Sequence, residues 1–222
     1  MTKNTQIKDR KRVVDHGEVF TSEREVNAML DLVKHEAERI ESRFLEPACG
    51  NGNFLAEILN RKLAVIVNKY KTSQVEFERY SVIAIGSMYG VDILADNVIE
   101  CRERLFNIWA DSYKKAFKNS YKQECLDSIK YILSKNILWG DALTLKTVCD
   151  NEDPIVFPQW SAINGTMIKR CDYTLANLLD YQPMGDDTLF GDLMSDTGNP
   201  IIIPPVYKDY SPIHYLKVSD YE

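Results

Sequence analysis

The chain has 222 residues, a formal net charge of −6 and a hydrophobic content of 45%. This length allows one domain with a modest appendage, and the composition is typical of a globular protein rather than a disordered one. A protein that binds duplex DNA by itself usually carries a basic patch, which the acidic balance does not favour. No apolar run approaches the roughly 18 residues that cross a bilayer, so we expect a cytoplasmic protein without a membrane partner.

The five cysteines are spread along the chain without a Cys-x-x-Cys pair, and only three histidines accompany them. This spacing is not typical of a zinc site. We therefore expect reduced, mostly buried thiols and no metal.

Residues 1–16 are predicted to be a basic N-terminal arm, either solvated or in contact with phosphate, that contains Lys8, Arg10, Lys11 and Arg12. A helix follows, capped by Ser22 or Thr21, with acidic residues in its first turn. It is predicted to extend to about Ile40. Its core-facing apolar positions, at helical spacing, are Val26, Met29, Leu30 and Val33.

Three short apolar runs then alternate with long helical patterns, and each run ends near an acidic residue, at Glu46, Asp92 and Asp141. The alternation of strands and helices predicts an α/β fold with a parallel sheet and helices on its faces. Ligands of such sheets bind beyond the carboxyl ends of the strands, so we expect the three acids to mark a binding site.

The last part of the chain is less regular. "PIVFPQW" reads as a strand or an extended loop, and "CDYTLANLLDYQP" begins like a strand. Residues 183–222 form a tail rich in Gly and Pro, with at most two short strands at 201–203 and 214–218.

The stretch "EPACGNGNF" follows the first predicted strand and contains Gly50 and Gly52. The dinucleotide-binding pattern requires a third Gly or Ala at the position of Leu55, and a phosphate-binding P-loop requires a lysine. We therefore predict neither a dinucleotide site nor a P-loop here. The stretch instead resembles the S-adenosylmethionine turn of DNA adenine methyltransferases, whose pattern is matched by Glu46, Pro47, Ala48, Gly50 and Gly52. The resemblance implies that Glu46 accepts from the ammonium group of the cofactor.

Two further segments resemble elements of the same family. "GEVFTS" is similar to the upstream Gly-Glu-Phe-Phe-Thr-Pro element, which implies that Phe20 packs near the cofactor and that Thr21 contacts its carboxylate. In "YGVDIL", Asp92 would bind the ribose hydroxyls and Ile93 would pack on the adenine. In "WGDAL", the corresponding cofactor-binding residues are Asp141 and Ala142. Asp141 would accept a hydrogen bond from the adenine amine.

The resemblance covers residues 17–182 and is to type I restriction-modification methylase subunits in particular. It implies a Rossmann-like methyltransferase fold, mostly parallel with flanking helices, that is truncated after its fourth strand. It also implies that residues 17–182 form an S-adenosylmethionine-binding domain.

In this family an Asn-Pro-Pro-aromatic element after the fourth strand holds the flipped adenine whose amine is methylated. Asn177 stands at the place of the Asn and Tyr181 is the candidate stacking ring, but Leu178, Leu179 and Asp180 replace the other residues of the element. Asn177 is thus either the residue that orients the amine or an ordinary loop residue of an inactive copy.

Two functions remain open. The chain is expected to bind S-adenosylmethionine and to methylate adenine in DNA, which it would contact through a partner chain, a recognition subunit or a second copy of itself. Alternatively, it is a catalytically inactive cofactor-binding or assembly subunit of a DNA modification system. Methylation of another substrate on the same fold stays open, because fold does not determine substrate.

Overall fold

In the computed structural model, residues 8–148, 151–179 and 204–221 are described. Three helices precede the first strand, namely α1 (Arg10–His16), α2 (Glu23–Leu32) and α3 (Lys34–Glu38). Ser22 caps α2 by accepting from the Glu25 N–H, and the Glu25 side chain accepts from the Ser22 N–H in return. This reciprocal capping box confirms the predicted start of the helix.

The helix predicted to extend to Ile40 is broken at Val33, between α2 and α3. The Val33 backbone has φ −119° and ψ 33°, which lies outside the α-helical region. Val26 and Leu30 are buried as predicted, whereas Met29 and Val33 are 54% and 46% exposed. Only half of the predicted apolar face therefore contacts the core.

A small sheet forms the centre of the fold, with the strand order β1-β2-β3-β4. Its strands are β1 (Phe44–Glu46), β2 (Met88–Asp92), β3 (Ile137–Asp141) and β4 (Lys146–Thr147). The first three are parallel, and β4 runs antiparallel to β3. The structure is thus α/β with a mostly parallel sheet and flanking helices, as predicted.

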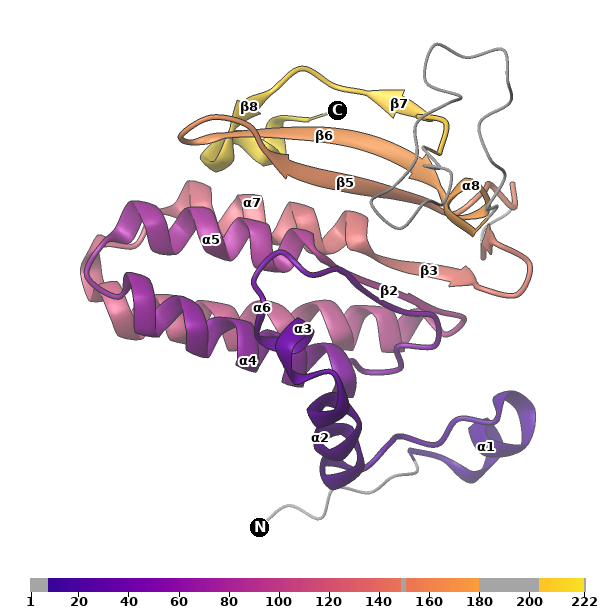
Figure 1. Ribbon diagram of the computed structural model, residues 1–222. Helices are drawn as coiled ribbons and strands as arrows, with labels where there is room; N and C mark the ends of the chain where they lie inside the picture. The colour runs from indigo at the N-terminus through magenta and orange to yellow at the C-terminus, as the bar shows by residue number, and fades with distance from the viewer. Residues whose placement is uncertain (1–7, 149–150, 180–203, 222) are drawn as a thin grey trace, which may run out of the picture.

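Each crossover between the parallel strands contains two long helices. The first crossover consists of α4 (Asn53–Tyr70) and α5 (Gln74–Gly86). The second consists of α6 (Ala95–Phe117), the short 3-10 helix η1 (Lys118–Ser120) and α7 (Gln123–Asn136). In both crossovers the first helix leads away from the strands and the second returns to them (Figure 1).

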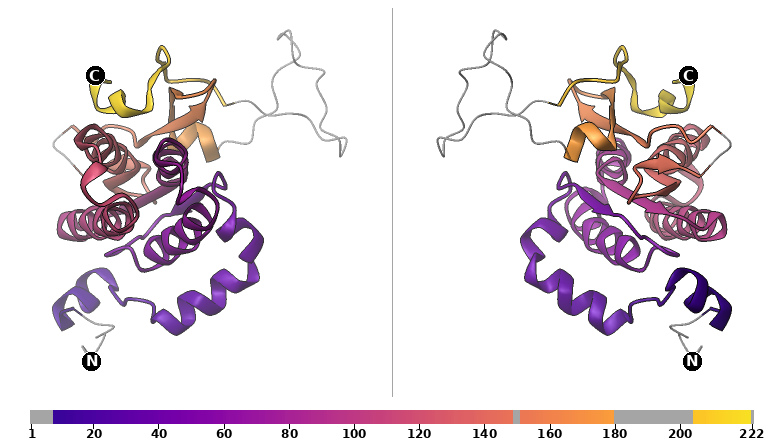
Figure 2. Two further views of the ribbon diagram at one scale, coloured as in Figure 1. Left: turned by 90° about the vertical axis from the view of Figure 1, so that its left-hand side faces the viewer. Right: turned by 90° about the vertical axis from the view of Figure 1, so that its right-hand side faces the viewer.

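The last third of the chain forms another sheet, which is antiparallel throughout. Its strands and the helices that follow them are β5 (Val156–Ala162), β6 (Met167–Thr174), α8 (Leu175–Leu179), β7 (Lys208–Asp209), β8 (Ile213–His214) and the 3-10 helix η2 (Tyr215–Asp220). β5 packs on α5 and α7, so these two helices lie between this sheet and the pair α4 and α6 (Figure 1). Figure 2 shows α1 and α2 at the opposite end of the molecule from η2.

The strand that leads to Asn177 is β6, which lies outside the parallel sheet. The family resemblance predicts this segment as the fourth strand of that sheet, but the fourth strand there is β4. The physical reason is local pairing, since β5 and β6 form a hairpin in register from Val156↔Thr174 to Ala162↔Ile168. A hairpin between neighbouring segments forms with little loss of chain entropy.

The prediction of a strand over 214–218 is wrong except for His214, which belongs to β8 and pairs with β6. The residues from Tyr215 to Asp220 form η2, and the His214 ring accepts from the Leu216 N–H at its start. Tyr215 and Val218, three residues apart, are both buried, which suits the three-residue turn of a 3-10 helix. The strand predicted at 201–203 lies outside the described residues.

The main core lies among the four long helices and supports the small sheet. Its large side chains are fully buried and include Leu55, Leu59, Phe77, Leu105 and Trp109. Such close packing fixes the helices relative to one another and therefore fixes the strand ends that they carry.

Candidate functional site

The three predicted acids lie at the carboxyl ends of the three parallel strands. Glu46 ends β1, Asp92 ends β2 and Asp141 ends β3. Glu46 is in register with Gly90, and Asp92 is in register with Trp139, so the acids are staggered along one edge of the sheet. The structure thus confirms the predicted placement of all three residues.

The glycine turn connects β1 to α4 and folds back over β2. The Cys49 N–H donates to the Val91 carbonyl at 2.9 Å, and the Gly50 N–H donates to Asp92 Oδ2 at 2.8 Å. Gly50 has φ +51°, and a Cβ there would lie 3.0 Å from the Phe20 ring. The turn therefore needs glycine at position 50 both for its backbone conformation and for the close approach of Phe20.

Gly52 has a different role in the turn. Its φ is +83°, and a Cβ would lie 2.6 Å from Cys101 Sγ of α6. Glycine at this position lets α4 begin directly against α6. Gly52 therefore shapes the site by packing and does not itself line the hollow described below.

Asp92 is 8% exposed and accepts three hydrogen bonds from the protein. Besides the Gly50 N–H, Oδ1 accepts from the Leu94 N–H at 2.9 Å and from Asn97 Nδ2 at 3.2 Å. A carboxylate offers about four acceptor positions, so about one remains available. The side chain is held in place before any ligand arrives.

A hollow of about 660 Å³ opens at this edge of the sheet, within the usual size of small-molecule sites. Of the eleven residues predicted to bind a cofactor, nine line it: Phe20, Thr21, Pro47, Ala48, Gly50, Asp92, Ile93, Asp141 and Ala142. We call this hollow the strand-end pocket. The structure thus brings together residues from four separate parts of the chain, which in the sequence are linked only by their motifs.

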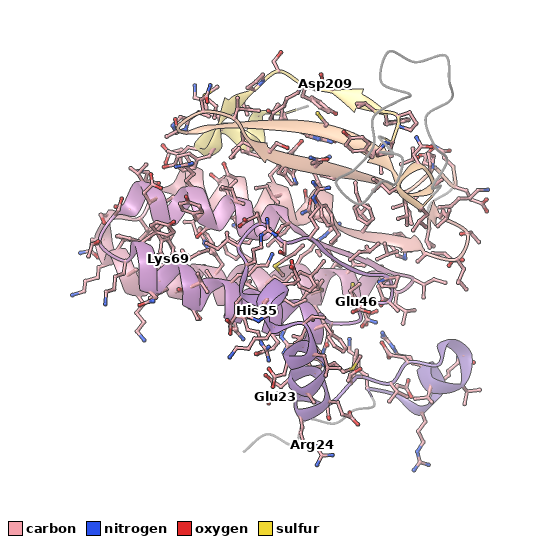
Figure 3. The ribbon with its side chains drawn as sticks, viewed as in Figure 1. Glu23, Arg24, His35, Glu46, Lys69 and Asp209 are labelled. Atoms are coloured by element: carbon pink, nitrogen blue, oxygen red, sulfur yellow. The ribbon has the colours of Figure 1, made fainter. Side chains whose placement is uncertain are left out.

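Of the eleven residues predicted to bind a cofactor, Glu46 is the second, besides Gly52, that does not line the strand-end pocket. It is half-buried, and burial raises the pKa of its carboxyl, although a backbone hydrogen bond from Ala48 opposes the shift. Figure 3 shows Glu46 well separated from Lys69, which lies near the end of α4.

The lining of the strand-end pocket is acidic. It includes Asp15, Glu18, Asp92 and Asp141, and none of its described lining residues is Lys, Arg or His. Asp141 Oδ1 accepts from the Leu143 N–H at 2.8 Å. Because like charges repel in a partly desolvated site, this lining disfavours phosphates and favours a ligand that carries positive charge.

Glu18, Asn53 and Asn97 line the same pocket but were not predicted as site residues. Asn97 is 1% exposed and lies five residues after Asp92, in the first turn of α6. Its position shortly after a predicted strand end is the sequence signal that could have identified Asn97 as a site residue. Glu18 belongs to the quoted "GEVFTS" element, and only its partners across the fold show its role.

Asn177 lies in α8, after β6, and is not among the residues that line the strand-end pocket. Its backbone N–H donates to Thr174 Oγ1 at 3.1 Å, and its Nδ2 donates to the Pro205 carbonyl at 3.5 Å. The next residue, Leu178, lines a separate apolar cavity of about 180 Å³ with aromatic residues of β1, β2, β5 and β6. Tyr181 lies outside the described residues.

Cys49, Cys101 and Cys125 are buried free thiols, whereas Cys171 is partly exposed. Within the described ranges, no group of His, Cys, Asp and Glu side chains could hold a metal ion. Nor is any helix of that part of the chain long and apolar enough to span a bilayer.

Comparisons with known proteins give no match, since no protein-family model, curated protein or solved structure is similar enough to this chain.

Proposed function

We propose that the strand-end pocket binds S-adenosylmethionine and that the chain is related to adenine-specific DNA methyltransferases of restriction-modification systems. The observation that carries the proposal is the acid-lined pocket, in which Asp92 and Asp141 stand at adjacent strand ends beside a glycine turn. S-adenosylmethionine carries a sulfonium and an ammonium group, so an acidic lining without described cations fits its charge. When bound, it supplies an electrophilic methyl group.

The contacts of Asp92 limit how it would hold a ribose. Its Oδ1 already accepts from Leu94 and Asn97, and its Oδ2 accepts from Gly50. The remaining acceptor position on Oδ2 allows one ribose hydroxyl rather than two. Asp141 would accept from the adenine amine, and Ile93, 46% exposed, would contact the ring. The role of Glu46 stays a prediction.

Transfer of the methyl group to an adenine amine in DNA is the first candidate activity. It would use Asn177 to orient the amine. The formal charge of −6 means that a partner chain or second copy would have to contribute most contacts to phosphate.

The second candidate is a non-catalytic cofactor-binding or assembly subunit. One observation favours it, namely that Asn177 follows a strand of the antiparallel sheet and is not part of the strand-end pocket lining. Its Nδ2 is directed to the Pro205 carbonyl. A group that orients an acceptor amine must lie within hydrogen-bond reach of it, beside the methyl donor.

Calorimetric titration of S-adenosylmethionine tests the binding proposal. We expect Asp141→Asn to weaken binding about tenfold or more, because a hydrogen bond to a charged group contributes about 1.5–3 kcal/mol. Asn can still accept from the Leu143 N–H, so the loop should keep its structure. Asp111→Asn, at an exposed position of α6, is the matched control and should bind normally. Absence of binding, or equal weakening by both variants, would contradict the proposal.

A methyl-transfer assay separates the two candidate functions. The protein is incubated with cofactor labelled on its methyl group and with DNA that contains adenine, in duplex and single-stranded form. Label on DNA that disappears with Asn177→Ala supports an enzyme. Cofactor binding without transfer supports the non-catalytic subunit.

A further inference from the structure

Residues 8–18 lie beside the strand-end pocket, and the end of this segment lines it. Asp9 caps α1 by accepting from the Lys11 N–H at 3.0 Å, and Gly17 ends the helix with φ +65°. The chain then turns back, so that Asp15, Gly17 and Glu18 line the pocket. The predicted basic arm is thus partly a helix that covers the site.

Arg12 fastens this segment to the rest of the molecule. Its Nε and one terminal nitrogen donate to the two oxygens of Glu18 at 2.6 and 2.7 Å, in a fork geometry. The other terminal nitrogen donates to Asp96 Oδ2 at 2.5 Å, at the start of α6. Lys8 adds ion pairs to Asp96 and Glu100. The contacts to Asp96 and Glu100 join positions more than 80 residues apart in the sequence.

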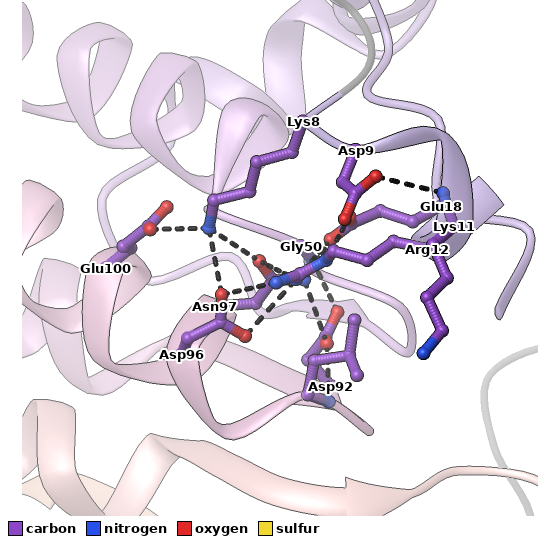
Figure 4. A network of polar contacts seen from close by, with 11 residues as sticks. Lys8, Asp9, Lys11, Arg12, Glu18, Gly50, Asp92, Asp96, Asn97 and Glu100 are labelled. Carbon is purple, nitrogen blue, oxygen red and sulfur yellow. Dashed lines mark hydrogen bonds and ion pairs between the residues drawn. The ribbon is translucent and has the colours of Figure 1, made fainter. Parts of the chain in front are cut away.

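The contacts continue from Arg12 to the glycine turn (Figure 4). Arg12 donates to Asn97 Oδ1 at 3.1 Å. The amide nitrogen on the other side, Asn97 Nδ2, donates to Glu18 at 2.7 Å and to Asp92 at 3.2 Å. Asp92 in turn accepts from the Gly50 N–H. Because the guanidinium must meet the amide oxygen, it fixes which side of the Asn97 amide faces Asp92.

We propose that Arg12 is a positioning residue of the strand-end pocket, which holds Asp92 and the glycine turn in their binding geometry through Glu18 and Asn97. The inference depends on the proposed function for the identity of the ligand, but not for the coupling between Arg12 and the turn. Arg12 does not line the pocket itself. Its charge is offset by Glu18 and Asp96, and the pocket stays acidic through Asp15, Asp92 and Asp141.

The charges of the contact network agree with this role. Burial of Glu18 would raise the pKa of its carboxyl, but hydrogen bonds from Arg12 and Asn97 outweigh burial and lower it. The hydrogen bond from Arg12 is also the main reason why the pKa of Asp96 is lowered. Both acids are thus held ionised, and since Asp96 is half-exposed, salt should weaken the network.

The first test uses the protein without cofactor. Hydrogen exchange of the Gly50 amide is compared in wild type, Arg12→Gln and Arg10→Gln. Arg10 is exposed on the same helix and is the matched control. We expect at least tenfold faster exchange at Gly50 in Arg12→Gln only, with unchanged exchange in the core of α4. Arg12→Lys should restore slow exchange only in part, because an ammonium cannot form the fork.

The second test measures S-adenosylmethionine binding by the same variants. We expect Arg12→Gln to raise Kd about tenfold, mainly through faster dissociation, while Arg10→Gln binds as wild type does. If wild type binds no S-adenosylmethionine, the proposed function fails, and the exchange result alone decides the role of Arg12. Equal Gly50 exchange in the two glutamine variants would overturn the inference, as would a uniform rise in exchange across the core.

Discussion

Lys62 is a fully buried lysine in the middle of α4. Its ammonium donates to the carbonyls of Ile40 and Ser42, at 3.0 and 2.6 Å, and to the Ser87 hydroxyl. These contacts join the end of α5 to the segment that enters β1. Burial lowers the pKa of Lys62 to about 7, and the nearby carboxylates Glu41 and Glu36 offset only part of this effect.

The Lys62 pKa predicts how the free energy of unfolding depends on pH. Between about pH 7 and the unfolded value of 10.5, the unfolded chain binds more protons than the folded chain, so stability should rise with pH. At about 1.4 kcal/mol per unit, the gain from pH 7 to 10 is a few kcal/mol. Lys62→Met should remove this rise, and Lys69→Met, exposed on the same helix, should keep it. Urea unfolding at each pH measures both, and identical pH profiles would refute the prediction.

At the scale of single residues, the sequence predicted the acids at the strand ends but not the network that holds them. Asp92 and Asp141 follow recognisable strands, so the rule for parallel sheets locates them. Arg12, Glu18 and Asn97 meet across the fold, and no local pattern encodes which of several basic residues forms the fork. Long-range polar pairing is therefore the part that sequence reasoning could not supply.

At the scale of elements, the contact between the starts of α4 and α6 shapes the site. Gly52 begins α4 with its backbone in the left-handed region and in contact with Cys101. The strand-end pocket depends on this contact, because Gly50 of the turn before α4 and Asp92 before α6 both line it.

Gly52→Ala is predicted to destabilise the protein by about 2–5 kcal/mol. A left-handed alanine costs about 1–2 kcal/mol, and the clash with Cys101 adds about 1–3 kcal/mol. Gly165→Ala is the matched control, because Gly165 has φ +55° but nothing within 4 Å of an added Cβ. It should show the backbone cost alone. Equal losses in the two variants, measured by urea unfolding, would show that the contact with α6 is unimportant.

The elements themselves were predicted where a local signal exists. The helix start at Ser22 or Thr21, the long helices and the three strands that end in acids follow from caps and apolar periodicity. The pairing of β6 with β5 and the 3-10 helix η2 were not predicted. Both depend on what the segment packs against, since a short apolar run is equally compatible with several partners.

At the scale of the whole molecule, Glu78 connects four elements. Its buried carboxylate accepts from Gln74 of α5, Tyr113 of α6, Lys122 before α7 and Tyr215 of η2. Burial would raise the pKa of Glu78, but the hydrogen bonds from these groups lower it. The carboxylate therefore fastens the C-terminal segment to the helices that support the site.

Tyr215→Phe should destabilise the protein by about 1–2 kcal/mol, because it removes a hydrogen bond of 2.6 Å to a buried charge. Tyr207→Phe is the control, since Tyr207 is 61% exposed. Thermal unfolding of both variants measures the difference. Two variants of equal stability would mean that the C-terminal segment is held by packing alone.

We propose that the acid-lined strand-end pocket binds a cationic adenosine cofactor. The most direct test is a calorimetric comparison of S-adenosylmethionine with ATP, which shares the adenosine but carries phosphates. We expect S-adenosylmethionine to bind and ATP to bind at least a hundredfold more weakly, since no described residue of the lining is cationic. Tighter binding of ATP would refute the proposal and would make the pocket a nucleotide site of another class.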